Sequence, residues 1–164
     1  MSASVRDEPA SILRPDIAAE TAVEEGTLTE SFTAVIGFPS GGSELDADAL
    51  AELEQVRAST QFTQTGAIIL RAHGDSAGSD VANERASEAR GLAVAEWLIA
   101  AGAEPRRIDV IVFGEQNPTL PNAMPDGSPN EAGRAANRRV EIEILAPPAD
   151  GQPEAGVSEP GDQP

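Results

Sequence analysis

The sequence predicts an α/β (α+β) two-layer sandwich, in which helices cover one face of a four-stranded mixed sheet. Its expected order is β-α-β-α-β-(loop or short helix)-β, because four short segments rich in β-branched and aromatic residues alternate with two long helical patterns. The strands keep one polar face, which is typical of a sheet covered on one side only. The length of 164 residues accommodates one such domain with flanking tails.

The first strand is predicted over residues 30–38, which read ESFTAVIGF and stop at a Pro/Gly turn. A helix follows over residues 43–59, with Ser43 or Asp46 as its N-cap. Its apolar face is expected to consist of Leu50, Leu53 and Val56.

The second strand is predicted over residues 65–73, and the long helix after it over residues 83–102, with Gly102 at its end. One face of the strand is expected to carry Ile68, Leu70 and Ala72, and the other Ile69, Arg71 and His73. The packed face of the helix is expected to consist of Ala86, Ala89, Ala93, Trp97 and Ala100, widened by Val94 and Leu98.

The last two strands are predicted over residues 106–115 and 138–145, and the second of these alternates most clearly. Its inward residues are expected to be Val140, Ile142 and Ile144. The Pro/Gly/Asn-rich connection over residues 117–134 is long for a compact domain, so it is expected to be either functional or mobile.

The two ends of the chain differ from this core in composition. Residues 1–31 hold seven acidic residues and two arginines, and residues 146–164 hold four acidic residues and no basic one. Both ends are poor in large apolar residues and rich in Pro, Ala, Glu and Gly. We therefore predict disordered acidic tails on either side of a folded domain over residues 32–145.

The composition excludes several classes of function. A net charge of −17 argues against nucleic acid as a partner. The absence of cysteine and the single histidine exclude disulfides and thiolate or His-rich metal sites, so no metal or cofactor is expected. No apolar stretch is long enough to cross a membrane, and the first residues lack the pattern of a signal peptide.

The loop after the second predicted strand reads GDSAG and contains Asp75. On the following helix, Asn83, Ser87 and Arg90 share one face, from which the Arg90 guanidinium can reach back toward Asp75. A carboxylate beside a guanidinium complements a zwitterion, with an ammonium on the first and a carboxylate on the second. The spacing alone, however, favours a turn-capping aspartate and an intramolecular ion pair.

Four blocks of the sequence, in order and at compatible spacing, are similar to the OmpA-like C-terminal domain. The first two blocks lie in HGDSAGSDVANERASEAR, the third in RIDVIVFGEQNP and the fourth in GRAANRRVEIEI. The resemblance covers roughly residues 32–145. This family is the peptidoglycan-associating module of outer-membrane proteins, lipoproteins and flagellar stator proteins.

The resemblance implies a binding protein rather than an enzyme, located in the periplasm or cell envelope and associated with the outer membrane. It would hold the diaminopimelate part of the peptidoglycan stem peptide noncovalently and tether the protein or its partner to the cell wall. Asp75 and Arg90 match the family's principal contacts. The other ligand-binding residues that it implies are Asn83, Gly74, Ser76, Gly78, Asn137, Arg138 and Arg139.

The chain departs from the family pattern at five positions within these blocks. Ala72 and Val112 stand where the family has glycine, Gly74 where it has threonine, Ala86 where it has leucine, and Gly91 where it has alanine. Both charged anchors are kept, so we expect the departures to change affinity more than ligand class.

Catalysis is a less favoured alternative. His73, Asp75 and Ser76 lie close together in the sequence, and Asp75 with Glu115 could imitate a glycosidase acid pair. No nucleophile elbow accompanies them, and Glu115 matches a residue of the family to which we assign a structural role. His73 is expected to be a hydrogen-bonded histidine at a strand end.

A calcium loop is a second alternative, since Asp126, Ser128 and Asn130 occupy positions 1, 3 and 5 of an EF-hand-like run. The match fails at position 6, where Glu131 replaces glycine, and at position 12, where Asn137 replaces glutamate.

A third alternative is a degenerate OmpA-like module that serves as a protein–protein interaction domain without binding peptidoglycan. The acidic tails or the long connection would then supply the contact surface.

Overall fold

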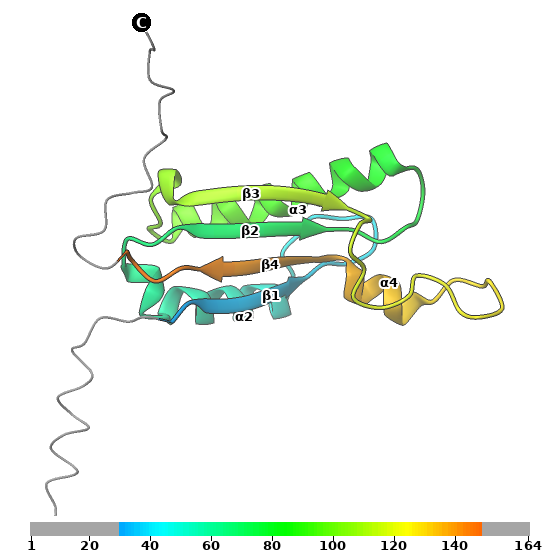
Figure 1. The fold of residues 1–164 in the computed structure, drawn as a ribbon, viewed down its shortest axis with the longest axis horizontal. Helices are drawn as coiled ribbons and strands as arrows, with labels where there is room; N and C mark the ends of the chain where they lie inside the picture. The colour runs from blue at the N-terminus through cyan, green and yellow to red at the C-terminus, as the bar shows by residue number, and fades with distance from the viewer. Residues whose placement is uncertain (1–29, 149–164) are drawn as a thin grey trace, which may run out of the picture.

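The computed structural model describes residues 30–148, which form one sheet and the helices that cover it (Figure 1). The predicted tails lie almost entirely outside the described residues. The elements in chain order are β1 (Phe32–Gly37), α2 (Ala47–Ala58), the 3-10 turn Gln61–Thr63, β2 (Ile68–His73), α3 (Asp80–Ala100), the 3-10 turn Pro105–Arg107, β3 (Ile108–Gly114), α4 (Glu131–Asn137) and β4 (Arg139–Ile144).

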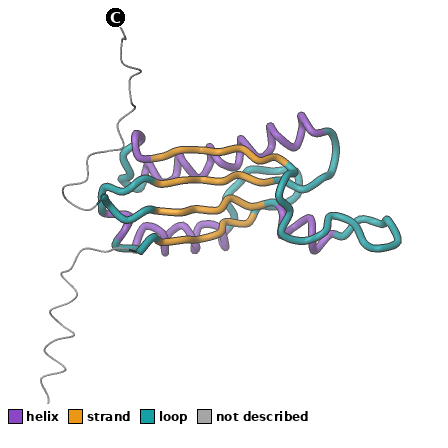
Figure 2. Tube along the Cα trace, in the orientation of Figure 1, coloured by secondary structure: helices purple, strands orange, loops and turns teal. Residues whose placement is uncertain are grey.

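The sheet has the order β1-β4-β2-β3, so the last strand of the chain lies in its interior. β4 pairs antiparallel with both β1 and β2, whereas β2 and β3 are parallel. A parallel pair needs a crossover, and α3 supplies it. Helices α2 and α3 lie on the same face of the sheet (Figure 2). The predicted two-layer α/β sandwich with a mixed sheet is therefore confirmed.

The core lies between this sheet and the helices. The inward residues of β2 and β4 are those that the alternation predicts, Ile68, Leu70, Ala72, Val140, Ile142 and Ile144, and all are buried. Leu53 and Val56 of α2 and Val94 and Leu98 of α3 pack against them and are fully buried. Burial of a large aliphatic side chain contributes about 1.5–3 kcal/mol, so this layer supplies most of the favourable free energy of folding.

Among the described residues, no helix covers the other face of the sheet (Figure 2), which is polar at its centre. Arg71 of β2 and Glu143 of β4 form an ion pair at 2.8 Å across neighbouring strands. Val35 on one edge strand and Ile111 on the other stay largely exposed. This face confirms the expected polar side of the strands.

The predicted packed face of α3 is wrong in part. Ala89 and Ala100 are exposed, and Asn83, Ser87, Arg90 and Gly91 are buried together with Val94, Ala95 and Leu98. The first half of the helix packs through polar side chains, which carry no hydrophobic periodicity. In α2, Leu50 is likewise 39% exposed and Ala49 takes its place in the core.

Helix caps set where both long helices begin. Asp46 caps α2, because its Oδ1 accepts a hydrogen bond from the backbone N–H of Ala49 at 2.8 Å. Ser79 caps α3 in the same way through Ala82, at 3.2 Å, so this helix begins three residues before the predicted start at position 83. Asp75 consequently lies only a short loop away from the helix.

The long connection between β3 and α4 projects from the end of the sheet as a hairpin-like loop (Figure 1). An isolated bridge pairs Ala123 with Pro129, and the N–H of Met124 donates to the carbonyl of Ser128 at 2.7 Å. Within residues 30–148, no helix combines the length and the apolar character that a membrane span needs.

Candidate functional site

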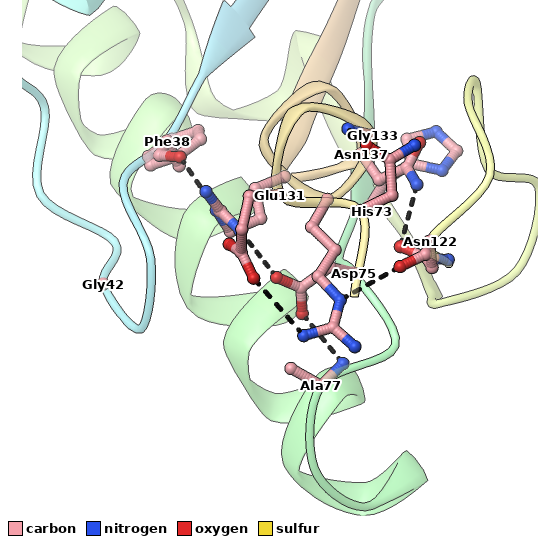
Figure 3. Close-up of polar contacts among 12 residues, drawn as sticks. Phe38, Gly42, His73, Asp75, Ala77, Asn122, Glu131, Gly133 and Asn137 are labelled. Carbon is pink, nitrogen blue, oxygen red and sulfur yellow. Dashed lines mark hydrogen bonds and ion pairs between the residues drawn. The ribbon is translucent and has the colours of Figure 1, made fainter. Parts of the chain in front are cut away.

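Asp75 lies in the loop between β2 and α3, at the end of the sheet from which the long connection projects. Its Oδ1 accepts a hydrogen bond from the N–H of Ala77 at 3.1 Å, which fixes the turn. Its Oδ2 pairs with Nη1 of Arg138 at 2.7 Å, and the two side chains are only 12% and 8% exposed. Figure 3 shows this carboxylate between Ala77 and the guanidinium that also reaches the Phe38 carbonyl.

Arg90 belongs to the same charge cluster but contacts different atoms. Its Nε donates to the carbonyl of Gly42 at 3.0 Å, and Nη1 donates to the carbonyl of His73 at 3.4 Å. Its guanidinium carbon lies 5.9 Å from the centre of the Phe38 ring, within the range of a cation–π contact. Burial lowers the pKa of Arg90, while Asp75 raises it in opposition. A guanidinium stays charged in proteins, so Arg90 is a buried cation beside Asp75.

The charges of this cluster do not cancel. Asp75 supplies one negative charge, whereas Arg90 and Arg138 supply two positive ones, all on side chains that are nine-tenths buried or nearly so. One positive charge is left over in a site with little solvent screening. The site therefore favours a ligand group with negative charge, while Asp75 remains available to a cation that takes the place of an arginine.

Two glycines shape the loop around Asp75. A Cβ on Gly74 would lie 2.9 Å from Oγ of Ser87 and 3.5 Å from Nη1 of Arg90, so the bare backbone lets strand and helix approach closely. Gly78 has a φ of +92°, a left-handed conformation that favours glycine. The loop between them also contains Ser76, which is half-buried.

Asn83 connects the start of α3 to the end of β3. Its Nδ2 donates to Oε2 of Glu115 at 2.8 Å, and its carbonyl accepts from Oγ of Ser87 at 2.7 Å. Glu115 is thereby held against the helix that carries Arg90. This contact agrees with a structural role for Glu115 and gives Asn83 the task of positioning it.

The segment NRR over residues 137–139 is divided among three places. Asn137, which is fully buried, accepts from the N–H groups of Thr119 and Leu120 and donates to Leu120 and Asn122, so it holds the long connection. Arg138 reaches Asp75, and Arg139 pairs with Glu141 at 2.7 Å. Arg139 and Glu141 are two residues apart on β4, so they share the open face of the sheet, away from Asp75.

His73 lies on the same open face as Arg139. Its ring stacks on Phe113 with 4.8 Å between centroids, and Nδ1 lies 3.4 Å from the carbonyl of Gln116. Nε2 is buried 3.8 Å from a Glu141 oxygen and has no hydrogen-bond partner in the part of the chain that the structure describes. The expectation of a hydrogen-bonded histidine therefore holds for one ring nitrogen. Burial and Arg139 lower the pKa of His73, which keeps it neutral at pH 7.

Phe38 is a site residue that the sequence analysis missed. It directly follows β1, where its carbonyl accepts from Nε of Arg138 and its ring faces Arg90. The available signal was its position: a large apolar residue directly after a strand and before a Pro/Gly turn. A cavity of about 380 Å³ opens beside it; its lining residues are Gly37, Phe38, Pro39, Asp46, Asp48, Ala49, Glu52, Ala135 and Arg138.

Among residues 30–148, no three potential metal-ligating side chains gather at one point. In the run considered for calcium, Oδ1 of Asp126 accepts two hydrogen bonds from Ser128, at 2.9 and 2.6 Å, and so closes a turn.

Comparison with known proteins places the chain in a family. Residues 37–132, more than half of the chain, match the OmpA family. The chain belongs to the OmpA family. This match includes the loop with Asp75, all of α3 and the end of β3.

Three relatives show how the similarity is distributed. The chain is 40% identical over 110 residues to photosystem I P700 chlorophyll a apoprotein A2 of Gloeobacter violaceus, which covers 67% of this chain and 12% of that protein. It is 33% identical over 114 residues to outer membrane protein A of Bordetella avium, which covers 70% of this chain and 56% of that protein. It is 31% identical over 122 residues to peptidoglycan-binding protein ArfA of Mycobacterium tuberculosis, covering 71% and 35%. The chain thus spans between about an eighth and somewhat over half of these relatives.

Solved structures share the fold. The peptidoglycan-associated lipoprotein of Burkholderia pseudomallei superposes with a TM-score of 0.58 at 19% identity, covering 66% of this chain and 86% of that one. The cell wall anchor of the type VI secretion system from Pseudomonas aeruginosa gives 0.57 at 22% identity, covering 80% and 96%. Membership of the OmpA family agrees with the expectation of a binding domain rather than an enzyme.

Proposed function

We propose that this domain binds peptidoglycan noncovalently, through the diaminopimelate part of the stem peptide, and so tethers the protein or a partner to the cell wall. The observation that carries the proposal is the buried cluster of one carboxylate and two guanidiniums formed by Asp75, Arg90 and Arg138. The free end of diaminopimelate is an amino-acid head group, whose ammonium and carboxylate complement these charges.

In this interaction the ammonium pairs with Asp75 and the carboxylate with Arg90, whose fork of donors suits bidentate binding. Backbone N–H groups of the loop over residues 74–78 assist, and Ser76 adds a hydroxyl at its rim. Asn83 acts by holding Glu115, while Asn137 and Arg139 act at a distance by fixing the long connection and the start of β4.

The relatives support the proposal by what their names state. One is called an outer membrane protein and another a peptidoglycan-binding protein, and one structural neighbour is a cell wall anchor. We accordingly propose a location in the cell envelope, with association to the outer membrane.

Pull-down with purified sacculi that contain diaminopimelate tests the proposal. We expect the wild-type chain to sediment with sacculi, and Asp75→Asn and Arg90→Gln to lose at least about 90% of the bound fraction, because each removes one charge of the two-point contact. Asp109→Asn on the open face of the sheet and Arg85→Gln on the exposed side of α3 remove the same charges elsewhere and should bind normally.

Circular dichroism of each variant verifies that the fold is kept. Equal sedimentation of wild type, Asp75→Asn and Arg90→Gln would refute the two-point contact. A folded wild type that never sediments would instead favour the protein–protein interaction module.

A further inference from the structure

We propose that Arg138 is an internal competitor for the ammonium position of the site: its guanidinium occupies Asp75 in the free protein and leaves it when a ligand ammonium arrives. The inference rests on the proposed function in its choice of ligand. It adds a residue that sets affinity and specificity, because the protein's own cation must be displaced before a ligand's cation can bind.

Asp75 is already engaged in the free protein. Its Oδ2 is engaged by Nη1 of Arg138 at 2.7 Å and its Oδ1 by the N–H of Ala77 at 3.1 Å, so both carboxylate oxygens already have a donor. With a side chain only 12% exposed, Asp75 has little further surface to offer. Each carboxylate oxygen can accept a second hydrogen bond, but with so little of its surface open an ammonium reaches Oδ2 by taking the place of Nη1.

Arg138, rather than Arg90, is the cation that moves. Arg90 is 2% exposed and is held by two backbone carbonyls, at 3.0 and 3.4 Å. Within residues 30–148, the Arg138 side chain has, besides its 2.7 Å contact with Asp75, a single hydrogen bond of 3.3 Å from Nε to the carbonyl of Phe38. Losing Asp75 therefore leaves Arg90 anchored and Arg138 nearly free.

The space next to Arg138 can receive its guanidinium. The cavity of about 380 Å³ that it lines is large enough for a guanidinium, and the start of α2 contributes Asp46, Asp48 and Glu52 to its wall. These carboxylates offer new partners to a cation that swings off Asp75. A buried charge without a partner is costly, so a second acidic environment within reach lowers the cost of the exchange.

Removal of Arg138 should change the affinity for an amine in the opposite direction to removal of a residue that only supports the ligand. When a site is occupied by its own side chain, the apparent affinity falls in proportion to the fraction of molecules in which the site is free. Removing Arg138 should therefore strengthen the binding of an amine that carries no carboxylate, whereas a merely supporting residue would weaken it or leave it unchanged.

The test is a titration of the full chain with cadaverine (1,5-diaminopentane), followed by the amide NMR shifts of residues 74–78, for wild type, Arg138→Gln and Arg71→Gln. Arg71→Gln is the matched control, because it removes the same charge from the open face of the sheet, where Arg71 pairs with Glu143. We expect Arg138→Gln to bind cadaverine on the order of tenfold more tightly than wild type, and Arg71→Gln to change this affinity less than twofold.

A second variant keeps the proposal testable if Arg138→Gln does not fold. Asp48→Asn/Glu52→Gln removes two charges from the cavity wall and keeps the Asp46 cap, so it should weaken binding of cadaverine about two- to threefold by making displacement of Arg138 costlier. The control Glu54→Gln/Glu88→Gln removes two exposed charges elsewhere and should leave this affinity unchanged.

If folded Arg138→Gln binds cadaverine as tightly as wild type or more weakly, the proposal is overturned. If Arg138→Gln does not fold, an affinity of Asp48→Asn/Glu52→Gln for cadaverine equal to that of wild type overturns it. Titration with diaminopimelate separates this result from the proposed function. Wild type that binds diaminopimelate while Arg138→Gln gains nothing for cadaverine refutes the competitor alone. Wild type that ignores diaminopimelate refutes the proposed function, whatever the cadaverine series shows.

Discussion

Gly91→Ala should destabilise the domain, although the same change in the interior of a helix normally stabilises it. Gly91 lies in the middle of α3, where alanine is favoured over glycine by about 1 kcal/mol. Here, however, a Cβ at position 91 would lie 2.7 Å from Cγ1 of Val110 and 3.2 Å from Cβ of Ala72. The first distance requires an atom to move, and both neighbours belong to the packed layer between helix and sheet.

The expected magnitude follows from these two opposing effects. Overpacking of a core costs about 1–3 kcal/mol, which exceeds the helix-propensity gain of about 1 kcal/mol. We predict a net loss of about 1 kcal/mol in the free energy of unfolding. This contact agrees with two departures from the family pattern that the resemblance implies: Ala72 stands in place of a glycine and Gly91 in place of an alanine, so one methyl group is kept between strand and helix.

Urea unfolding followed by circular dichroism measures this change. Ala89→Gly, at an exposed position of the same helix, is the matched control and should cost about 1 kcal/mol. In a double-mutant cycle, Gly91→Ala with Val110→Ala should be less destabilised than the sum of the single changes, by about 0.5–1 kcal/mol. A Gly91→Ala variant that is more stable than wild type by about 1 kcal/mol would refute the packing argument.

Three further changes test other contacts. Because the folded state lowers the pKa of His73, the free energy of unfolding should be greatest above the ordinary histidine pKa of about 6.5 and should fall as the pH drops toward the lowered value. In urea unfolding from pH 7.5 to 5, His73→Gln should make this fall less steep. Parallel curves for wild type and His73→Gln would contradict the prediction. Asn137→Ala should lower the free energy of unfolding by about 1–3 kcal/mol and speed amide hydrogen exchange at Thr119 and Leu120, because their N–H groups lose their acceptor. Unchanged exchange would show that the loop does not depend on Asn137. Asp46→Ala should lower stability by about 1 kcal/mol and Asp46→Asn by much less, as thermal unfolding would show; equal losses would exclude the cap as the cause.

The fold could be predicted because alternation and caps are local signals. Val140, Ile142 and Ile144 face inward as their spacing indicates, and Asp46 caps its helix as one of two candidates. The packed face of α3 could not be predicted in the same way. Its first turns are buried through Asn83 and other polar residues, whose partners come from distant segments and leave no hydrophobic pattern.

The residues of the site could be predicted from the sequence better than the contacts between them. The sequence brought Asp75 and Arg90 to one cluster, yet the direct partner of Asp75 is Arg138, 63 residues away. The separation of Arg138 from Arg139 depends on where β4 begins, since one residue more or less would exchange their faces. Long-range packing decides such a register, so the motif alone could not assign the two arginines different roles.

The central claim is that the cluster of Asp75, Arg90 and Arg138 receives the amino-acid head group of diaminopimelate. Titration with a stem peptide that contains diaminopimelate, followed by NMR shifts of backbone amides and arginine side chains, tests it most directly. We predict saturable shifts for residues 74–78 and for Nε–H of Arg90 and Arg138, with the open-face residues Arg71 and Glu143 unaffected. An unperturbed Asp75 loop in wild type, at peptide concentrations that reach the millimolar range, would contradict the claim.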